Sequence, residues 1–239
     1  MADRRAELAA NAEAVRSRIA AACTAAGRPA DSVRVVAITK TWPASDVRLL
    51  AGLGFRDVGE NRDQEARPKA AQCADLELTW HFVGQLQRNK AASVVSYAHV
   101  VQSVDRARLI AALDRAAEQA GRRVGVCIQV DLDPEAGGEA DPHLGRGGAR
   151  ADQVLALADL VVTTQNLDLL GVMAVAPLGV DPRGPFDRLA AIHRSLLALH
   201  PTALMRSAGM SADLEAAVLA GATHLRLGSA LLGHREPLK

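Results

Sequence analysis

The segment VRVVAIT (residues 33–39) is a continuous run rich in β-branched residues, and Lys40 follows it directly. Strands that are covered by helices on both faces have this character, because neither face needs alternating polar residues. Such strands occur in the parallel sheets of α/β proteins. The segment therefore predicts a buried parallel strand that ends at a lysine.

Similar short apolar runs alternate with helical patterns along the rest of the chain. Further strands are predicted at 57–58, 79–83, 100–104, 124–130, 170–174, 203–205 and 224–227. Helices are predicted at 44–53, 61–73, 86–95, 106–120, 150–160, 186–199 and 212–220, with a short final segment at 229–232. Eight βα alternations without a composition break predict an α/β fold, a single (β/α)8 TIM-type barrel in one domain over residues 1–239. An open doubly wound sheet is the alternative, although it usually has fewer units.

Residues 2–26 precede the first strand and predict an extra N-terminal helix. Apolar residues from Leu8 to Ala26 recur at helical spacing, which indicates a helix docked on the barrel. Acidic residues interrupt its basic charge, and no signal-peptide block is present. No apolar run approaches the roughly 18–20 residues that cross a bilayer. We therefore expect a cytoplasmic protein without a membrane association.

Composition excludes several classes of function. Hydrophobic residues make up 49% of the 239 residues, and the formal net charge is +1, without the clustered basic charge of a nucleic-acid surface. The three cysteines, Cys23, Cys73 and Cys127, are far apart and form no metal-ligand pattern, so a reducing compartment and no metal site are expected. A GxxxxGK[ST] phosphate loop, a GxSxG elbow and an HExxH zinc helix are all absent.

Lys40 is the first candidate for chemistry. At the end of a barrel strand its stem would lie against apolar walls at the barrel mouth. Partial desolvation favours a neutral amine, which attacks an aldehyde to form a Schiff base. The alternative is a solvated lysine that begins an ordinary βα loop.

A second candidate lies near the C-terminus. The segment SAGMSAD (207–213) joins the seventh predicted strand to a helix, and Gly228 and Ser229 follow the eighth. Barrels often bind phosphate with these two loops, and small residues let backbone N–H groups approach an anion. The alternative is a serine N-cap followed by an ordinary glycine turn.

Arg226 lies in the last predicted strand, two residues before that turn. An inward-facing arginine needs a partner, because an unpaired buried charge is very costly, and a pyridine nitrogen would accept one of its hydrogen bonds. A lysine for an aldehyde, an arginine for a ring nitrogen and a serine and glycine cup for a phosphate together predict pyridoxal 5′-phosphate (PLP) as the cofactor.

At these positions the sequence resembles the pyridoxal phosphate homeostasis protein family, the single-domain relatives of the barrel domain of alanine racemase. The resemblance covers about residues 33–235. It rests on VAITK (36–40), VGENRDQE (58–65), WHFVGQLQRNK (80–90), SVDR (103–106), GVMAVAP (171–177) and SAGMSADLEAAVLAGATHLRLGSALLG (207–233).

The resemblance implies a role for particular residues. Lys40 is expected to hold PLP as a Schiff base, Asn61 to lie beside it, and Arg226 to face the pyridine nitrogen. The residues implied for the phosphate are Ser207, Ser211, Gly228 and Ser229. His81 and Asn89 lie in family motifs, where they either line the site or support it from behind.

Two departures from the family pattern leave this assignment intact. Ser229 stands where many members have Thr, which keeps the hydroxyl, and Ala208 stands where Leu or Met is common. The loop over 133–148 varies in the family and indicates little.

The resemblance further implies a monomeric binding protein for intracellular PLP homeostasis, which buffers PLP or delivers it to PLP-dependent apo-enzymes, with no catalytic residues. A racemase needs acid/base groups on both faces of its intermediate, and two-domain racemases take one, a tyrosine, from a C-terminal β domain. This chain ends at Lys239, soon after the barrel, and its only tyrosine, Tyr97, precedes the fourth strand. Arg226 would also keep the ring nitrogen unprotonated, which makes a poorer electron sink. A weak PLP-dependent amino-acid racemase is the alternative, and an interaction module with an incidental pocket is a third hypothesis.

Overall fold

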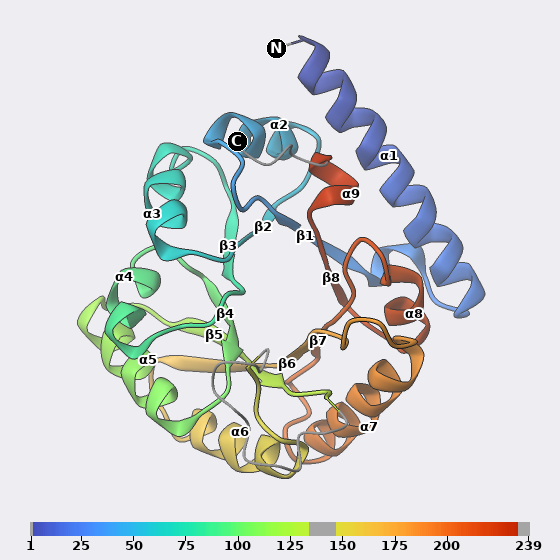
Figure 1. Cartoon of the computed structure of the whole chain (residues 1–239). Coiled ribbons are helices and arrows are strands. Elements are labelled where there is room, and N and C mark those ends of the chain that lie inside the picture. Colours follow the sequence, from blue (N-terminus) through green and yellow to red (C-terminus); the bar gives the residue numbers. More distant parts are fainter. Residues whose placement is uncertain (1, 134–146, 234–239) are drawn as a thin grey trace.

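The computed structural model describes residues 2–133 and 147–233. Its eight strands form a closed barrel in chain order, and parallel pairing of β1 with β8 closes it. Figure 1 shows the helices arranged around this barrel. The predicted (β/α)8 TIM-type barrel is confirmed, and the open doubly wound sheet is excluded because the first and last strands are hydrogen-bonded.

The elements follow one another as strand and helix. The strands are β1 (Arg34–Ile38), β2 (Asp57–Glu60), β3 (Thr79–Phe82), β4 (Val100–Val104), β5 (Val124–Val130), β6 (Leu167–Ala174), β7 (Met205–Ser207) and β8 (His224–Leu227). The α-helices are α1 (Ala2–Ala25), α2 (Ala44–Gly52), α3 (Asp63–Gln72), α4 (Ala91–Val95), α5 (Ala107–Gln119), α6 (Val154–Val162), α7 (Arg183–Leu199), α8 (Leu214–Leu219) and α9 (Ser229–Leu232). Short 3-10 turns are η1 (Ala30–Ser32), η2 (Arg88–Lys90) and η3 (Ala151–Gln153).

The strands are buried because helices cover their outer face and side chains fill the interior. Every residue of β4 is buried, including the polar Gln102 and Ser103. Helix α5 turns Leu109, Ile110 and Leu113 toward the barrel, and all three are fully buried. Most of the core is one cluster of buried hydrophobic residues, and Cys127, Met173 and Met205 form a second, smaller cluster.

The predicted N-terminal helix is present and docked. Helix α1 lies beside α8 and α9, outside the ring of the other helices (Figure 1). Its Leu8 and Ala12 are fully buried, and Asn11 donates from Nδ2 to the carbonyl oxygen of Leu231 at 3.0 Å. The helix therefore supports the segment that follows β8.

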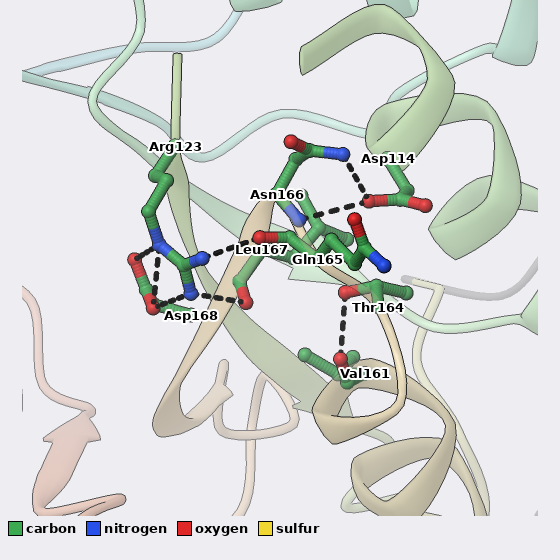
Figure 2. Close-up of polar contacts among 8 residues, drawn as sticks. All are labelled: Asp114, Arg123, Val161, Thr164, Gln165, Asn166, Leu167 and Asp168. Carbon is green, nitrogen blue, oxygen red and sulfur yellow. Dashed lines mark hydrogen bonds and ion pairs between the residues drawn. The ribbon is translucent and has the colours of Figure 1, made fainter. Parts of the chain in front are cut away.

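Strand β6 begins at Leu167, three residues earlier than predicted, because a polar residue in the strand obscured its start. Asp168 accepts hydrogen bonds from Arg123, which lies just before β5, and Figure 2 shows this pair. Asn166 donates from its backbone N–H and its side chain to Asp114 on α5, at 3.1 and 3.0 Å. These contacts fix the turn between α6 and β6.

Two further elements differ from the sequence prediction. The helix expected over 86–95 begins with the turn η2 and becomes α-helical only at Ala91. Strand β7 covers Met205–Ser207 instead of 203–205, because its charged middle residue, Arg206, gives no apolar signal. Ser207 therefore belongs to the barrel wall, and not to the loop that follows. Most of the loop predicted over 133–148 lies outside the described residues.

Candidate functional site

A cavity of about 490 Å³ opens at the carboxyl ends of the barrel strands. Its size is that of an ordinary small-molecule site, and this end of a barrel is where functional sites occur. The lining residues come from the ends of β1, β2, β3, β6, β7 and β8 or from the loops that follow. They are Ile38, Lys40, Asn61, Val83, Met173, Val175, Met210, Ser211, Ala212, Arg226, Gly228 and Ser229.

Lys40 follows β1 by two residues and lines the cavity. Within residues 2–133 and 147–233, its amine has no hydrogen-bond or ion-pair partner. The next residue, Thr41, has a φ of 67°, a strained conformation for a residue with a branched Cβ. The backbone N–H of Thr41 donates to Glu65 Oε2 at 3.0 Å, which holds this turn. The structure thus presents an unpaired amine from a fixed backbone.

A buried ion pair that the sequence analysis missed lies behind Lys40. Lys69 on α3 pairs with Glu60 at the end of β2, and its Nζ also donates to the carbonyl oxygen of Thr39 at 2.7 Å. The Thr39 hydroxyl donates to the same carboxylate. Burial raises the pKa of Glu60, and the hydrogen bond from Lys69 opposes that shift. Glu60 directly precedes Asn61 in the GEN motif, and this motif is the sequence signal from which a role for Glu60 could have been predicted.

Asn61 also lines the cavity. It follows β2, and Gly84 after β3 approaches its backbone very closely. A Cβ at position 84 would lie 2.1 Å from the carbonyl oxygen of Asn61. Only glycine therefore leaves room for Asn61 in this position.

Ser211, Gly228 and Ser229 line the cavity from the loops after β7 and β8. Ser211 Oγ accepts a hydrogen bond from the backbone N–H of Ala230 at 3.1 Å, which ties the β7–α8 loop to α9. Gly209, in the same loop, has a φ of +93°, and a Cβ there would lie 2.5 Å from Ala217 Cβ. Gly209 thus lets the β7–α8 loop pack closely against α8, and Ser211 joins this loop to α9.

Arg226 in β8 is 4% exposed and reaches the cavity from the barrel interior. Its Nη1 donates to the carbonyl oxygen and Oγ of Ser207 at 2.7 and 2.8 Å, and its Nη2 donates to the carbonyl oxygen of Ala174 at 2.7 Å. Among the described residues it has no carboxylate within ion-pair distance. Burial lowers the pKa of Arg226 to about 10, which still leaves it charged at neutral pH. A guanidinium has more N–H donors than these contacts use, so Arg226 can also donate to a ligand.

Ser207 and His81 are not brought to the cavity. Ser207 is fully buried in β7, and its hydroxyl donates to Gln102 Oε1 at 2.7 Å inside the barrel. His81 lies between Asp57 and Gln102, so it supports the site from behind. Asn89 is exposed in η2, and Tyr97 is buried outside the barrel mouth.

The side chains that meet in the cavity fit PLP. Lys40 offers a free amine for the aldehyde, and Arg226 offers a buried N–H donor for the ring nitrogen. Ser211, Gly228 and Ser229 form a cup of small residues for the phosphate. Ile38, Met173 and Val83 supply an apolar wall for the ring. Gln102, Glu60 and Lys69 are the residues that sequence reasoning missed.

Comparison with known proteins shows the family of this chain. The family model for the alanine racemase N-terminal domain matches residues 8–236. The pyridoxal phosphate homeostasis protein of Mycobacterium tuberculosis is 44% identical over 250 residues, which cover 98% of this chain and 95% of that protein. The protein of the same name from Pseudomonas aeruginosa is 37% identical over 229 residues, which cover 96% of each chain.

Solved structures give the same relationship. PipY of Synechococcus elongatus with PLP bound superposes with a TM-score of 0.80 at 33% identity, covering 95% of this chain and all of PipY. Alanine racemase of Clostridium difficile superposes with a TM-score of 0.74 at 12% identity, which shows a shared fold alone, and this chain covers 57% of it. The chain therefore belongs to the pyridoxal phosphate homeostasis protein family, whose barrel is that of the alanine racemase N-terminal domain.

Proposed function

We propose that this protein binds PLP in the barrel cavity, as a Schiff base on Lys40, and serves PLP homeostasis by buffering or delivering the cofactor. The observation that carries the proposal is the unpaired amine of Lys40 in one cavity with the buried guanidinium of Arg226. The names of the relatives and the PLP-bound structure of PipY support it. When bound, PLP supplies a reactive aldehyde and an electron-withdrawing ring.

Each lining residue has a role in this proposal. The Lys40 amine forms a C=N bond with the aldehyde carbon, and the aldehyde oxygen leaves as water. Asn61 lies beside the ring, and Arg226 donates to the ring nitrogen. Ser211, Gly228 and Ser229 hold the phosphate. Ser207 does not contact it, but supports Arg226 from within the barrel.

The cavity favours binding over catalysis. Its only ionisable side chains from the described residues are Lys40 and Arg226. A guanidinium cannot supply or accept a proton near neutral pH, so Lys40 is the one acid/base group available. Racemisation needs a group on each face of the substrate. We therefore infer a binding protein without catalytic residues, and a weak amino-acid racemase is the second candidate.

Membership of this family also suggests a cellular location, an oligomeric state and partners. We propose a cytoplasmic monomer that acts as one domain over residues 1–239 and passes PLP to PLP-dependent apo-enzymes. No helix in the described part of the chain is long and apolar enough to span a bilayer. Metal ions and nucleic acids have no part in this proposal.

Reduction of the PLP-loaded protein with borohydride tests the role of Lys40. Peptide mapping should place one pyridoxyl group on Lys40, and the visible absorbance of the protein should disappear in Lys40→Ala. The matched control is Lys90→Ala, which removes a lysine outside the cavity and should retain both signals. A label on another lysine, or none, would refute the proposal.

A further inference from the structure

The charge of Arg226 is buried without a carboxylate partner among the described residues, so its orientation depends on neutral acceptors. Two of these acceptors are backbone carbonyl oxygens of strands β6 and β7. The third, Ser207 Oγ, is a hydroxyl that can rotate. The group that hydrogen-bonds to the Ser207 hydroxyl therefore decides whether Arg226 has an acceptor in a fixed position.

A chain of hydrogen bonds runs from Arg226 across the barrel interior. Arg226 Nη1 contacts Ser207 Oγ at 2.8 Å, and Ser207 Oγ contacts Gln102 Oε1 at 2.7 Å. Gln102 Nε2 contacts His81 Nδ1 at 2.9 Å, and His81 Nε2 contacts Asp57 Oδ1 at 2.8 Å. We call these five residues, from β8, β7, β4, β3 and β2, the Arg226 relay. Gln102 and Ser207 are fully buried, and His81 is 2% exposed.

The carboxylate of Asp57 sets the direction in which the hydrogen bonds of the relay are donated. Burial opposes ionisation of this carboxyl group, but the hydrogen bond from His81 and nearby positive charges hold its pKa below the ordinary value. An ionised carboxylate only accepts, so the facing His81 Nε2 must carry a hydrogen. In the neutral imidazole, Nδ1 is then the acceptor, which the structure pairs with the Gln102 amide N–H.

The same logic continues to Arg226. With its NH₂ group facing His81, Gln102 turns its oxygen to Ser207, and the Ser207 hydroxyl donates to it. The lone pairs of Ser207 are then free to accept from Arg226. Every donor in the relay thus points away from Arg226 and toward Asp57.

We propose that Gln102, Ser207, His81 and Asp57 are positioning residues that fix the Arg226 guanidinium, so that its remaining N–H donors face the ligand. The relay then selects an aromatic ligand whose ring nitrogen is an unprotonated acceptor. This selectivity rests on the proposed binding of PLP. The fixed guanidinium itself is a property of the ligand-free protein, and can be tested without PLP.

Two variants interrupt the relay at different places. Gln102→Met removes the central amide at similar size, and Asp57→Leu removes the acceptor at the far end, which does not line the cavity. Ser103→Ala is the matched control, because Ser103 is the next residue of β4 and its hydroxyl is buried without a hydrogen-bond partner among the described residues. Far-UV circular dichroism confirms that each variant is folded. Should Gln102→Met fail to fold, Asp57→Leu decides the test.

The first measurement is the affinity of each variant for PLP and for its 1-deaza analogue, which has a carbon in place of the ring nitrogen. Loss of a hydrogen bond to a charged group predicts about tenfold weaker PLP binding in both relay variants. Affinity for the analogue should stay unchanged, and Ser103→Ala should bind both as the wild type does. An equal loss for both ligands, or no loss for either, would overturn the proposal.

The second measurement separates the relay from the proposed function. In the ligand-free protein, ¹⁵N–¹H spectra at low temperature should show distinct, slowly exchanging Nη signals for Arg226, assigned with Arg226→Lys. These signals should persist in Ser103→Ala and broaden in Gln102→Met and Asp57→Leu. Signals that persist in the relay variants refute the relay whether or not PLP binds. A wild type that shows the signals but does not bind PLP refutes only the proposed function.

Discussion

The position of Lys40 is fixed by residues that do not line the cavity. Lys69 holds the carbonyl oxygen of Thr39, and Glu60 accepts from both residues, so the backbone just before Lys40 is fixed by a buried ion pair. The Glu60 Oε2 atom is buried and has no hydrogen-bond partner within the described residues. This carboxylate therefore depends strongly on Lys69 for its charge balance.

Removal of Lys69 should destabilise the protein in a pH-dependent way. Lys69→Met leaves the Glu60 carboxylate buried and unpaired, which typically costs about 3–5 kcal/mol. Burial already raises the pKa of folded Glu60, and loss of Lys69 raises it further. The folded state then binds the proton more tightly than the unfolded state does. Stability falls as pH rises from the unfolded pKa, roughly 4.3, through the folded pKa.

Urea unfolding of Lys69→Met at several pH values measures this effect. The deficit relative to the wild type should be smallest near pH 4 and grow toward pH 7. Lys90→Met removes a partly exposed lysine and should stay within about 0.5 kcal/mol of the wild type at each pH. A deficit in Lys69→Met that does not change with pH would show that Glu60 is not the group responsible.

The elements show why some of the site could be predicted from sequence. Lys40, Asn61 and Ser229 follow strands whose apolar runs mark their ends, so their place at the barrel mouth follows from local pattern and chain order. Ser207 was misplaced because β7 is three residues long and has a charged centre. The contact between Gln102 in β4 and Ser207 in β7 arises only when the barrel closes, so no local pattern carries it.

Helix α1 supports the cavity through the elements on which it packs. It lies against α8 and α9, and Arg18 donates to the carbonyl oxygen of Ser211 at 3.1 Å. Leu8→Ala in this helix removes a fully buried side chain and should lower the free energy of unfolding by about 2–5 kcal/mol. Chemical denaturation measures this loss, with the exposed Glu13→Ala on the same helix as the control. A loss below about 1 kcal/mol in Leu8→Ala would mean that α1 is only loosely attached.

At the scale of the whole molecule, residues from distant parts of the chain meet in one cavity at the barrel mouth. Six of the eight strands, or the loops that follow them, line the cavity. Helix α1, outside the ring of the other helices, packs against α8 and α9, which precede and follow β8 in the chain. The alanine racemase that shares this fold is longer, since this chain covers 57% of it. A shared fold does not fix a shared activity, which depends on the particular groups that reach each site.

Incubation with L-alanine tests whether the barrel racemises amino acids. In the proposed function Lys40 is the one acid/base group and moves a proton on one face only, and the lack of a general acid/base on the other face typically costs about 10²–10⁴ in rate. The PLP-loaded protein should therefore form D-alanine slower than an alanine racemase by at least this factor, as chiral chromatography of timed samples measures. Lys40→Ala gives the background rate, and Lys90→Ala should match the wild type. D-alanine formation at the rate of the reference racemase, lost in Lys40→Ala, would show that a second acid/base group reaches the cavity and that the protein is an enzyme.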